Sequence, residues 1–401
     1  MNNKPTVVMM GLGYIGLPTA ALIASRGLFV TGVDIREEVV DTINQGKIHI
    51  VEPDLDGLVH HVVKEGFLKA STTPVEADVY LIAVPTPFKD NHVPDLSYVS
   101  AAVRKIIPTL KKESLVILES TSPVGTTHKI QELIGKERPE LKGKVSIAYC
   151  PERVLPGDII RELKHNDRAI GGIDEKSTQK AIEFYKHFVV GELHATNSKT
   201  AEMVKLVENA SRDNQIAFAN ELSIICDKAG INVWELIHLA NKHPRVNILR
   251  PGTGVGGHCI AVDPWFIVSE FPEEAKLIKK SRDINNYKTQ WVLEKIKATA
   301  LQFKIDNNKD AVIACMGLAF KPDIDDLRES PALFVADQLK ADGFTTLEVE
   351  PNLNSSVERP LATIQEAISK ADIIVYLVGH KGFKNLNIPE PKKVLDFVGI
   401  V

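Results

Sequence analysis

The sequence has few cysteines, and they form no cluster. Its 401 residues include four, Cys150, Cys226, Cys259 and Cys315, without a CxxC pair. Such spacing provides neither a disulfide framework nor a set of zinc ligands. We therefore expect no metal site, and reduced thiols fit a cytoplasmic location.

The sequence also lacks a basic tract. Its 48 basic and 52 acidic residues give a net charge of −4, and no Lys/Arg run interrupts them. The sequence therefore gives no sign of the basic patch that would bind a nucleic acid or an anionic membrane. Binding of small anionic ligands is not excluded, because it needs only a few local charges.

Only one stretch is free of charge for long enough to suggest a signal peptide or a membrane span. Residues 7–24 read VVMMGLGYIGLPTAALIA. Three spaced glycines and Pro18 would make a poor spanning helix, so the pattern predicts a buried strand that turns into a buried helix. We expect no targeting segment and no membrane span.

The first part of the chain alternates short apolar runs with helical patterns. The predicted strands are 6–11, 28–34, 78–84, 114–120 and 145–150, and the helices between them include 36–45 and 97–107. Apolar strands joined by helices predict right-handed crossovers and a mostly parallel, doubly wound sheet. We place this first domain at 1–198.

A helical region follows and then a second α/β part. Residues 199–229 contain no Pro or Gly and end at Gly230, which predicts one long helix, with more helix at 233–241 and 273–304. Strands at 310–320, 345–350 and 371–380 and a helix at 331–343 follow. The expected boundaries are 199–300 for the helical, dimer-forming region and 301–401 for a smaller nucleotide-type domain.

A glycine-rich loop follows the first predicted strand. Gly11-Leu12-Gly13-Tyr14-Ile15-Gly16 is a GxGxxG motif, and Asp34 ends the second strand. In a dinucleotide site the glycines allow the tight turn, the approach of the pyrophosphate and helix packing, while the acid binds the ribose hydroxyls. The carboxylate of Asp34 favours NAD over NADP, although the basic Arg36 does not exclude NADP as the cofactor. The alternative is a simple tight turn.

Cys259 is the candidate nucleophile among the four thiols. It follows Gly252-Thr253-Gly254-Val255-Gly256-Gly257-His258, where glycines let substrate and backbone donors come close to sulfur. Free cysteines are more often small buried hydrophobes, and Cys150, Cys226 and Cys315 lie in apolar segments of that kind.

The long helix carries polar residues at helical spacing. Lys205, Asn209 and Arg212 are four and three residues apart, so they share one face. A solvated stripe and a functional face remain equal interpretations of this pattern.

Several longer motifs make the resemblance to a family plain. They are GLGYIGLPTA, VPTP at 84–87, ESTSPVGTT at 119–127, YCPERVLPG at 149–157, TAEMVKLVENASRDNQIAFANEL at 200–222, NKHPRVNILRPGTGVGGHCIAVDPWF at 241–266 and GLAFKPDIDDLRESP at 317–331. In this order they resemble the UDP-glucose/GDP-mannose dehydrogenase family over essentially the whole chain. The resemblance implies an N-terminal Rossmann domain for NAD, a long dimerising helix and a C-terminal Rossmann-like domain for UDP.

The resemblance also implies a four-electron oxidation that uses two NAD per sugar. Cys259 would be the nucleophile that forms a thiohemiacetal and then a thioester, and Lys205 would be the general acid/base. Asn209 and Asp263 would support them by hydrogen bonding, and Thr121 and Glu152 would line the reacting centre. These residue types suit the chemistry, because a dehydrogenase that stops at the aldehyde has no use for the thiol.

Binding residues follow from the same motifs. The implied contacts to NAD are Gly11, Gly13, Tyr14, Ile15, Gly16, Asp34, Arg36, Thr86, Thr121 and Arg328. The implied contacts to the UDP-sugar are Arg153, Val154, Lys205, Asn209, Arg212, His243, Arg245, Gly256, Phe320 and Lys321.

The substrate is a finer inference. His258, the AVDPWF stretch and the HPRVN stretch resemble the members that oxidise UDP-N-acetyl-D-mannosamine, with UDP-N-acetyl-D-glucosamine or another UDP-hexose as the alternative. Two other classes are a two-electron β-hydroxyacid dehydrogenase and a non-catalytic nucleotide-binding protein. The glycine loop with Cys259 argues against the first, and the set of Lys205, Asn209, Cys259 and Asp263 against the second.

Two positions depart from the family pattern. The family usually has a basic residue two positions after the Asp of its last strand, and here Val398 takes that place in Asp396-Phe397-Val398-Gly399. Lys392 or Lys393 are the candidates to compensate. Thr253 stands where relatives often have Pro, which we expect to matter little.

Overall fold

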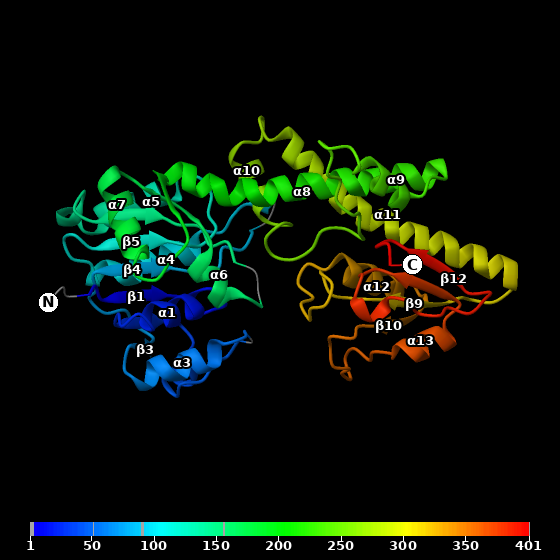
Figure 1. Cartoon of the computed structure of the whole chain (residues 1–401), viewed down its shortest axis with the longest axis horizontal. Helices are drawn as coiled ribbons and strands as arrows, with labels where there is room; N and C mark the ends of the chain where they lie inside the picture. Colours follow the sequence, from blue (N-terminus) through cyan, green and yellow to red (C-terminus); the bar gives the residue numbers. More distant parts are fainter. Residues whose placement is uncertain (1–3, 51, 90–91, 155–156, 401) are drawn as a thin grey trace. The chain divides into compact units, whose positions relative to one another are not determined.

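The computed structural model describes residues 4–50, 52–89, 92–154 and 157–400. The chain divides into two compact units, a first unit of residues 1–207 and a second unit of residues 208–401 (Figure 1).

The first unit is built on one eight-stranded sheet. Its strands are β1 (Val7–Met10), β2 (Val30–Val33), β3 (Leu68–Ser71), β4 (Val79–Ile82), β5 (Leu115–Leu118), β6 (Ser146–Tyr149), β7 (Arg168–Gly172) and β8 (Leu193–Asn197). They lie in the order β3-β2-β1-β4-β5-β6-β7-β8, and every pair is parallel except β6 with β7. The order reverses beside β1, which is where open α/β sheets bind their ligands.

Helices cover both faces of this sheet. They are α1 (Gly16–Ala24), α2 (Glu37–Asn44), α3 (Leu55–Lys64), α4 (Ser97–Ile106), α5 (Thr126–Glu137), α6 (Ile159–His165) and α7 (Glu175–Tyr185). Val7 and Met9 of β1 enter one core with α1, α2 and α3, and Val8 and Met10 enter the other with α4 and α5. This alternation follows from the two-residue period of a strand.

A single long helix, α8 (Ser198–Ala229), spans the boundary between the units. It runs without a break because its 32 residues include no Pro or Gly. Gly230, with φ of 69°, ends it in the left-handed conformation that favours glycine.

The second unit has a smaller sheet. Its elements after α8 are α9 (Val233–Ala240), α10 (Asp263–Glu270), α11 (Lys276–Asn307), β9 (Val312–Met316), α12 (Pro331–Ala341), β10 (Thr345–Val349), α13 (Ile364–Lys370), β11 (Ile373–Tyr376) and β12 (Lys393–Asp396). The four strands are parallel in the order β10-β9-β11-β12. Residues of α11 and α12 pack on one face and residues of α13 on the other.

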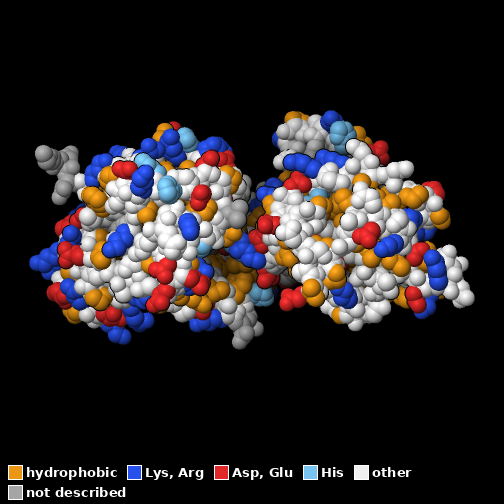
Figure 2. Space-filling model, turned by 90° about the horizontal axis from the view of Figure 1, so that it is seen from below, with side chains coloured by type: hydrophobic (Ala, Val, Ile, Leu, Met, Phe, Trp, Pro, Cys, Tyr) orange, Lys and Arg blue, Asp and Glu red, His pale blue; other side chains and the backbone are white. Residues whose placement is uncertain are grey.

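The architecture confirms the predicted fold class: an α/β first part, a long central helix and a second α/β part. Residues 7–24 form β1 and α1, not a span, and no helix within the described residues is long and apolar enough to cross a membrane. On the face seen in Figure 2, basic and acidic side chains are interspersed, in keeping with the lack of a basic tract.

Three strands of the large sheet were missed: β3, β7 and β8. β3 and β8 are the edges of the large sheet, and β8 is mostly exposed, so neither has the apolar run of a buried strand. β7 reads RAIGG, and its arginine and two glycines hide the pattern.

Candidate functional site

The glycine loop after β1 has the geometry of a dinucleotide site. Gly11 has φ of 91°, and a Cβ there would lie 2.5 Å from the Ala83 carbonyl oxygen. A Cβ on Gly16 would lie 1.9 Å from the Gly11 carbonyl oxygen, so only glycine lets α1 start here. Beside Gly13 the space is open, with nothing within 4 Å of the place of a Cβ. The loop therefore fits NAD, whose pyrophosphate needs that approach.

Asp34 lies at the carboxyl end of β2, next to this loop. Its Oδ2 accepts a hydrogen bond from the Leu12 amide at 3.2 Å, and its Oδ1 accepts from the Arg36 amide at 3.0 Å. The Arg36 Nε is 3.4 Å from Oδ1. The structure thus brings Asp34 and Arg36 together with the glycine loop. Tyr14 is exposed, and Ile15 and Thr86 are half-buried.

The loop after β5, which carries Thr121, is held by a carboxylate that the sequence did not reveal. Glu202 of α8 is fully buried and accepts from the Gly125 amide at 2.6 Å and from the Thr127 amide at 2.7 Å. Both amides belong to the N-terminus of α5, which favours a negative charge. Glu202 lies three residues before Lys205 on α8, so this bond ties the Thr121 loop to the helical turn of Lys205.

The loop after β6 carries Glu152, Arg153 and Val154. Glu152 is buried, its Oε1 accepts from the Arg153 amide at 2.6 Å, and its Oε2 is 3.7 Å from Nη1 of buried Arg168. Glu52 accepts from the Gly157 and Ile159 amides farther along, at 2.9 and 2.8 Å. Leu155 and Pro156 of the predicted motif lie outside the described residues.

A second buried carboxyl, Glu119, lies behind this loop. The Tyr185 hydroxyl donates to its Oε1 at 2.6 Å. Burial, and then the charge of Glu152, raise the pKa of Glu119 to about 7. Glu152 is therefore close enough to Glu119 for its charge to act on that carboxyl.

In the second unit, α8 anchors both ends of the segment that contains Cys259. The Asn220 Oδ1 accepts from the Gly252 amide at 2.9 Å, and the Asn209 Nδ2 donates to Oδ2 of Asp263 at 2.5 Å. Asp263 is 2% exposed and begins α10. Asn209 therefore does not belong to a solvated stripe.

The anchor at Gly252 is backed by a buried polar chain between α8 and α11. Asn220 donates to Asn285 at 2.9 Å, Asn285 donates to Asp213 at 2.7 Å, and Arg282 donates to Asp213 at 2.6 Å. These side chains are buried, so each hydrogen bond replaces water that the interior excludes. These hydrogen bonds could not be predicted from the sequence, because the residues that form them are far apart in it.

The four thiols differ in their surroundings as predicted. Burial raises the pKa of Cys150 to about 11 and that of Cys315 to about 12, and it also raises the pKa of Cys226. These three are buried, whereas Cys259 is half-exposed in the glycine loop.

Phe320 lies against the glycine loop within the second unit. A Cβ on Gly256 would lie 2.9 Å from the Phe320 Cβ, and one on Gly257 would lie 2.8 Å from its Cε2. The Gly257 amide donates to the Arg328 carbonyl at 3.1 Å. The structure therefore brings Gly256, Phe320 and the backbone of Arg328 together.

The remaining predicted ligand residues are mostly at the surface. Arg153, Arg212, His243, Arg245, Lys321 and Arg328 are exposed, and Val154 and Lys205 are half-buried. The half-buried Thr121 sits in the loop that Glu202 holds.

One expectation about departures from the family pattern needs correction. The Lys392 ammonium donates to the Ser369 and Ala371 carbonyls at the end of α13, so it is already engaged. Lys393 starts β12, at the opposite end of the strand from Val398. Neither lysine can take the place of a basic side chain at 398. The Thr253 hydroxyl, which a Pro would lack, is buried and donates to the Leu377 carbonyl at 2.6 Å.

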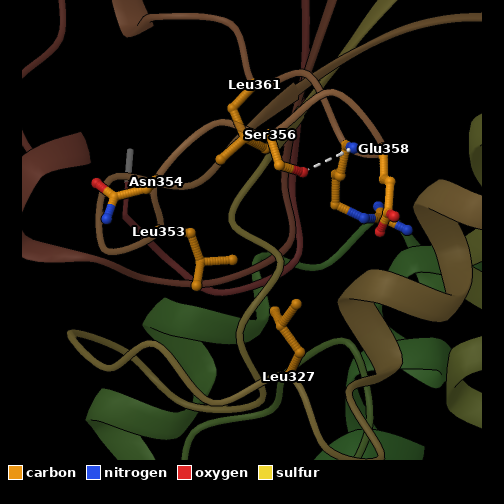
Figure 3. Close-up of a pocket in the computed structure, with 7 residues that line it drawn as sticks. Leu327, Leu353, Asn354, Ser356, Glu358 and Leu361 are labelled. Atoms are coloured by element: carbon orange, nitrogen blue, oxygen red, sulfur yellow. Dashed lines mark hydrogen bonds between the residues drawn. The ribbon is translucent and has the colours of Figure 1, made fainter.

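The second unit also has a pocket that the sequence did not indicate. It measures about 410 Å³ and is lined by Leu327, Leu353, Asn354, Ser356, Glu358, Arg359 and Leu361 (Figure 3). The Arg359 amide donates to the Ser356 hydroxyl at 3.0 Å across its rim. Most of this lining comes from the loop after β10, which has no motif of its own.

Comparison with protein families gives three matches along the chain. Residues 5–189 match the NAD binding domain of the UDP-glucose/GDP-mannose dehydrogenase family, residues 199–287 its central domain and residues 314–401 its UDP binding domain.

Individual relatives extend this likeness over the whole length. The UDP-N-acetyl-D-mannosamine dehydrogenase of Escherichia coli strain K12 is 56% identical over 399 residues, which cover 95% of each chain. An NDP-N-acetyl-D-galactosaminuronic acid dehydrogenase of Ralstonia nicotianae is 53% identical, over 98% of this chain and 96% of its own. The solved UDP-D-ManNAc dehydrogenase of Pyrococcus horikoshii has a TM-score of 0.86 at 38% identity, over 99% of this chain and 96% of its own.

Proposed function

Because the chain belongs to the UDP-glucose/GDP-mannose dehydrogenase family, we propose that it oxidises carbon 6 of UDP-N-acetyl-D-mannosamine from an alcohol to a carboxylate. The product is UDP-N-acetyl-D-mannosaminuronate, and two NAD are reduced per sugar. The observation that carries the proposal is the half-exposed Cys259, held in a glycine loop whose two ends are hydrogen-bonded to α8.

The first unit supplies the cofactor site. NAD, when bound, accepts a hydride at each oxidation. Gly11, Gly13 and Gly16 let the backbone approach the pyrophosphate of NAD. Asp34 accepts hydrogen bonds from the ribose hydroxyls. Tyr14, Ile15, Arg36, Thr86, Thr121 and Arg328 complete the proposed contacts.

Lys205 moves the proton in the first oxidation. Its amine takes the proton of the 6-hydroxyl as the C6–H bond breaks, which leaves an aldehyde. Asn209, four residues on along α8, stabilises the oxygen with its amide, and its own orientation is fixed by the bond to Asp263.

Cys259 then captures the aldehyde. Its sulfur forms a bond to C6 and loses its proton, while the carbonyl π pair becomes an oxygen lone pair that is protonated, which gives a thiohemiacetal. Loss of the second C6 hydride and of the hydroxyl proton gives a thioester. Glu152 or Asp263 takes a proton from water, the water oxygen bonds to C6, and the sulfur leaves. The sum is one alcohol, two NAD⁺ and one water to one carboxylic acid, two NADH and two protons.

The UDP-sugar is held by exposed or half-exposed side chains. The proposed set is Arg153, Val154, Lys205, Asn209, Arg212, His243, Arg245, Gly256, Phe320 and Lys321. Arginines suit a diphosphate because the guanidinium fork matches its oxygens. The division 1–198, 199–300 and 301–401 assigns the cofactor, the catalytic helix and the UDP moiety to successive parts of the chain.

The protein is proposed to act as a homodimer or higher homo-oligomer in the cytoplasm. Phe218 and Ile225 are exposed and seven residues apart on α8, so they share one face of the helix. Exposed Leu239 follows on α9. A second copy of the chain would remove this apolar face from water.

The decisive experiment counts NADH and identifies the product by mass spectrometry. Purified protein receives UDP-N-acetyl-D-mannosamine, UDP-N-acetyl-D-glucosamine or UDP-N-acetyl-D-galactosamine with excess NAD. We expect two NADH per sugar and a carboxylate, fastest with the mannosamine. One NADH and an aldehyde or ketone would indicate a two-electron dehydrogenase, and binding without turnover would indicate a non-catalytic protein.

A further inference from the structure

A buried acid–histidine pair lies at the carboxyl edge of the small sheet, and the proposed chemistry does not use it. Glu350 follows β10 and is 3% exposed, and His380 comes after β11 and is 1% exposed. The His380 Nε2 is 2.9 Å from the Glu350 Oε2. Burial of two such groups costs free energy unless hydrogen bonds compensate for the lost water.

Glu350 fixes the start of the loop after β9. Its Oε2 accepts from the Leu318 amide at 2.8 Å and from the Ala319 amide at 3.0 Å. Its Oε1 accepts from the Asn352 amide at 3.1 Å. Burial alone would raise the pKa of Glu350, but the bonds from His380, Leu318 and Ala319 lower it to about 2. The group is therefore an acceptor-only carboxylate.

His380 fixes the other end of the same loop. The Asp323 amide donates to its Nδ1 at 2.9 Å. Nδ1 is thus an acceptor, so we assign the ring proton to Nε2, which donates to Glu350. The ring also packs edge-on against Phe383, with centroids 5.2 Å apart. Residues 318–323 are consequently held at both ends by one rigid pair.

The segment between these two ends carries Phe320 and Lys321. Phe320 fills the space beside Gly257 and shares the space beside Gly256 with Glu329 and Pro331, and Cys259 lies two residues beyond Gly257. A displacement of Phe320 would therefore remove one of the contacts that hold the glycine loop. The contacts run without a gap from Glu350 and His380, through Phe320, to the loop of the proposed nucleophile.

We propose that Glu350 and His380 are positioning residues that set the place of Phe320 and Lys321 and, through Phe320, of the Cys259 loop. The inference rests on the proposed function for its kinetic consequence, but the placement of Cys259 can be measured without turnover.

Three variants at 380 separate the bond at Nε2 from the contacts at Nδ1, which is also 3.1 Å from the Asn352 Nδ2. His380→Gln keeps a donor that can reach Glu350, His380→Asn keeps an acceptor for the Asp323 amide, and His380→Ala keeps neither. Glu350→Gln replaces a carboxylate that only accepts hydrogen bonds with an amide whose NH2 group would face several donors. We expect His380→Ala and Glu350→Gln to lower kcat/KM for the UDP-sugar by about tenfold to a hundredfold, because small misplacements cost that much. His380→Gln and His380→Asn should each recover part of the loss.

The matched control is Leu339→Ala, in the buried face of α12. It creates a cavity in the same unit without removing a bond to residues 318–323, so it should lower the unfolding midpoint and leave kcat/KM within about twofold. Thermal unfolding of every variant gives the destabilisation for comparison.

The second readout is alkylation of Cys259 by iodoacetamide, followed by mass spectrometry of its peptide in the absence of substrate. We expect the rate to rise at least about threefold in His380→Ala and to stay at the wild-type value in Leu339→Ala, because freeing the glycine loop exposes a half-buried thiol. Equal rates in all proteins, or an equal change in the control at equal destabilisation, would overturn the positioning role. Absence of wild-type turnover would sink the proposed function alone, because the alkylation rates still decide the placement.

Discussion

Lys288 offers a test of how the second unit is stabilised. This α11 side chain is 1% exposed, its ammonium is 2.8 Å from the Ser223 hydroxyl, and it lies 4.1 Å from the centre of the Trp291 ring. Burial lowers the pKa of Lys288 to about 7, and the charge of Asp227 opposes the shift only in part. The unfolded chain holds this proton up to the ordinary pKa of 10.5.

The direction in which stability changes with pH follows from the number of protons that Lys288 binds in the folded and unfolded states. Between pH 7 and 10.5 the unfolded state binds more protons at Lys288 than the folded state, so stability rises with pH in that window. The shift corresponds to a penalty of about 4 kcal/mol at pH 7 and about 2 kcal/mol at pH 9. Lys288→Met removes the penalty and keeps a similar volume. Ser223 retains its own bond to the Asn220 carbonyl at 2.6 Å.

We therefore expect Lys288→Met to gain more stability at pH 7 than at pH 9, by about 2 kcal/mol. The assay is urea unfolding followed by tryptophan fluorescence at fixed protein concentration. It reports on the second unit, because all three tryptophans, Trp234, Trp265 and Trp291, lie there.

The matched control is Lys295→Met, on the same helix. Lys295 makes a half-exposed ion pair with Asp227 at 2.9 Å, so its loss should change stability by less than about 1 kcal/mol and equally at both pH values. If Lys288→Met shifts stability equally at pH 7 and pH 9, the buried ammonium does not carry the penalty and the reasoning is wrong.

Four further outcomes are expected. Cys259→Ser should abolish carboxylate formation while a UDP-sugar still binds, checked by product mass spectrometry and calorimetry; wild-type turnover would end the thioester proposal. Gly16→Ala should unfold more easily even without NAD, since its Cβ would meet the Gly11 carbonyl at 1.9 Å, whereas Gly13→Ala should keep its stability and lose NAD affinity about tenfold or more. Burial raises the pKa of Glu119 to about 7, so its protonated form stabilises the fold below pH 4.5 and that contribution is lost as pH rises through 7. Glu119→Gln should therefore gain up to about 3 kcal/mol at pH 8 and little at pH 4.5, measured by urea unfolding. Phe218→Glu should shift the protein toward monomer in light scattering; an unchanged mass would place the interface elsewhere.

The local features of the fold could be predicted because each depends on neighbours in sequence. Apolar runs predicted β1, β2, β4, β5 and β6, because strands buried on both faces have nearly continuous apolar sequences. The absence of Pro and Gly between 199 and 229 predicted α8, and the glycine spacing predicted the turn into α1. Cys259 stood out from the other thiols for the same local reason.

The contacts between distant segments were decided only by the tertiary structure. The Thr121 loop is held by Glu202, more than 70 residues away, and the loop with Phe320 by Glu350 and His380. A glutamate that caps a distant loop has the same sequence signature as one on the surface. The depressed pKa of Lys288 likewise arises from burial among α8, α11 and Phe397, which no spacing along the chain encodes. Hydrogen bonds and desolvation depend on distance in space, and that distance is fixed only when the elements pack.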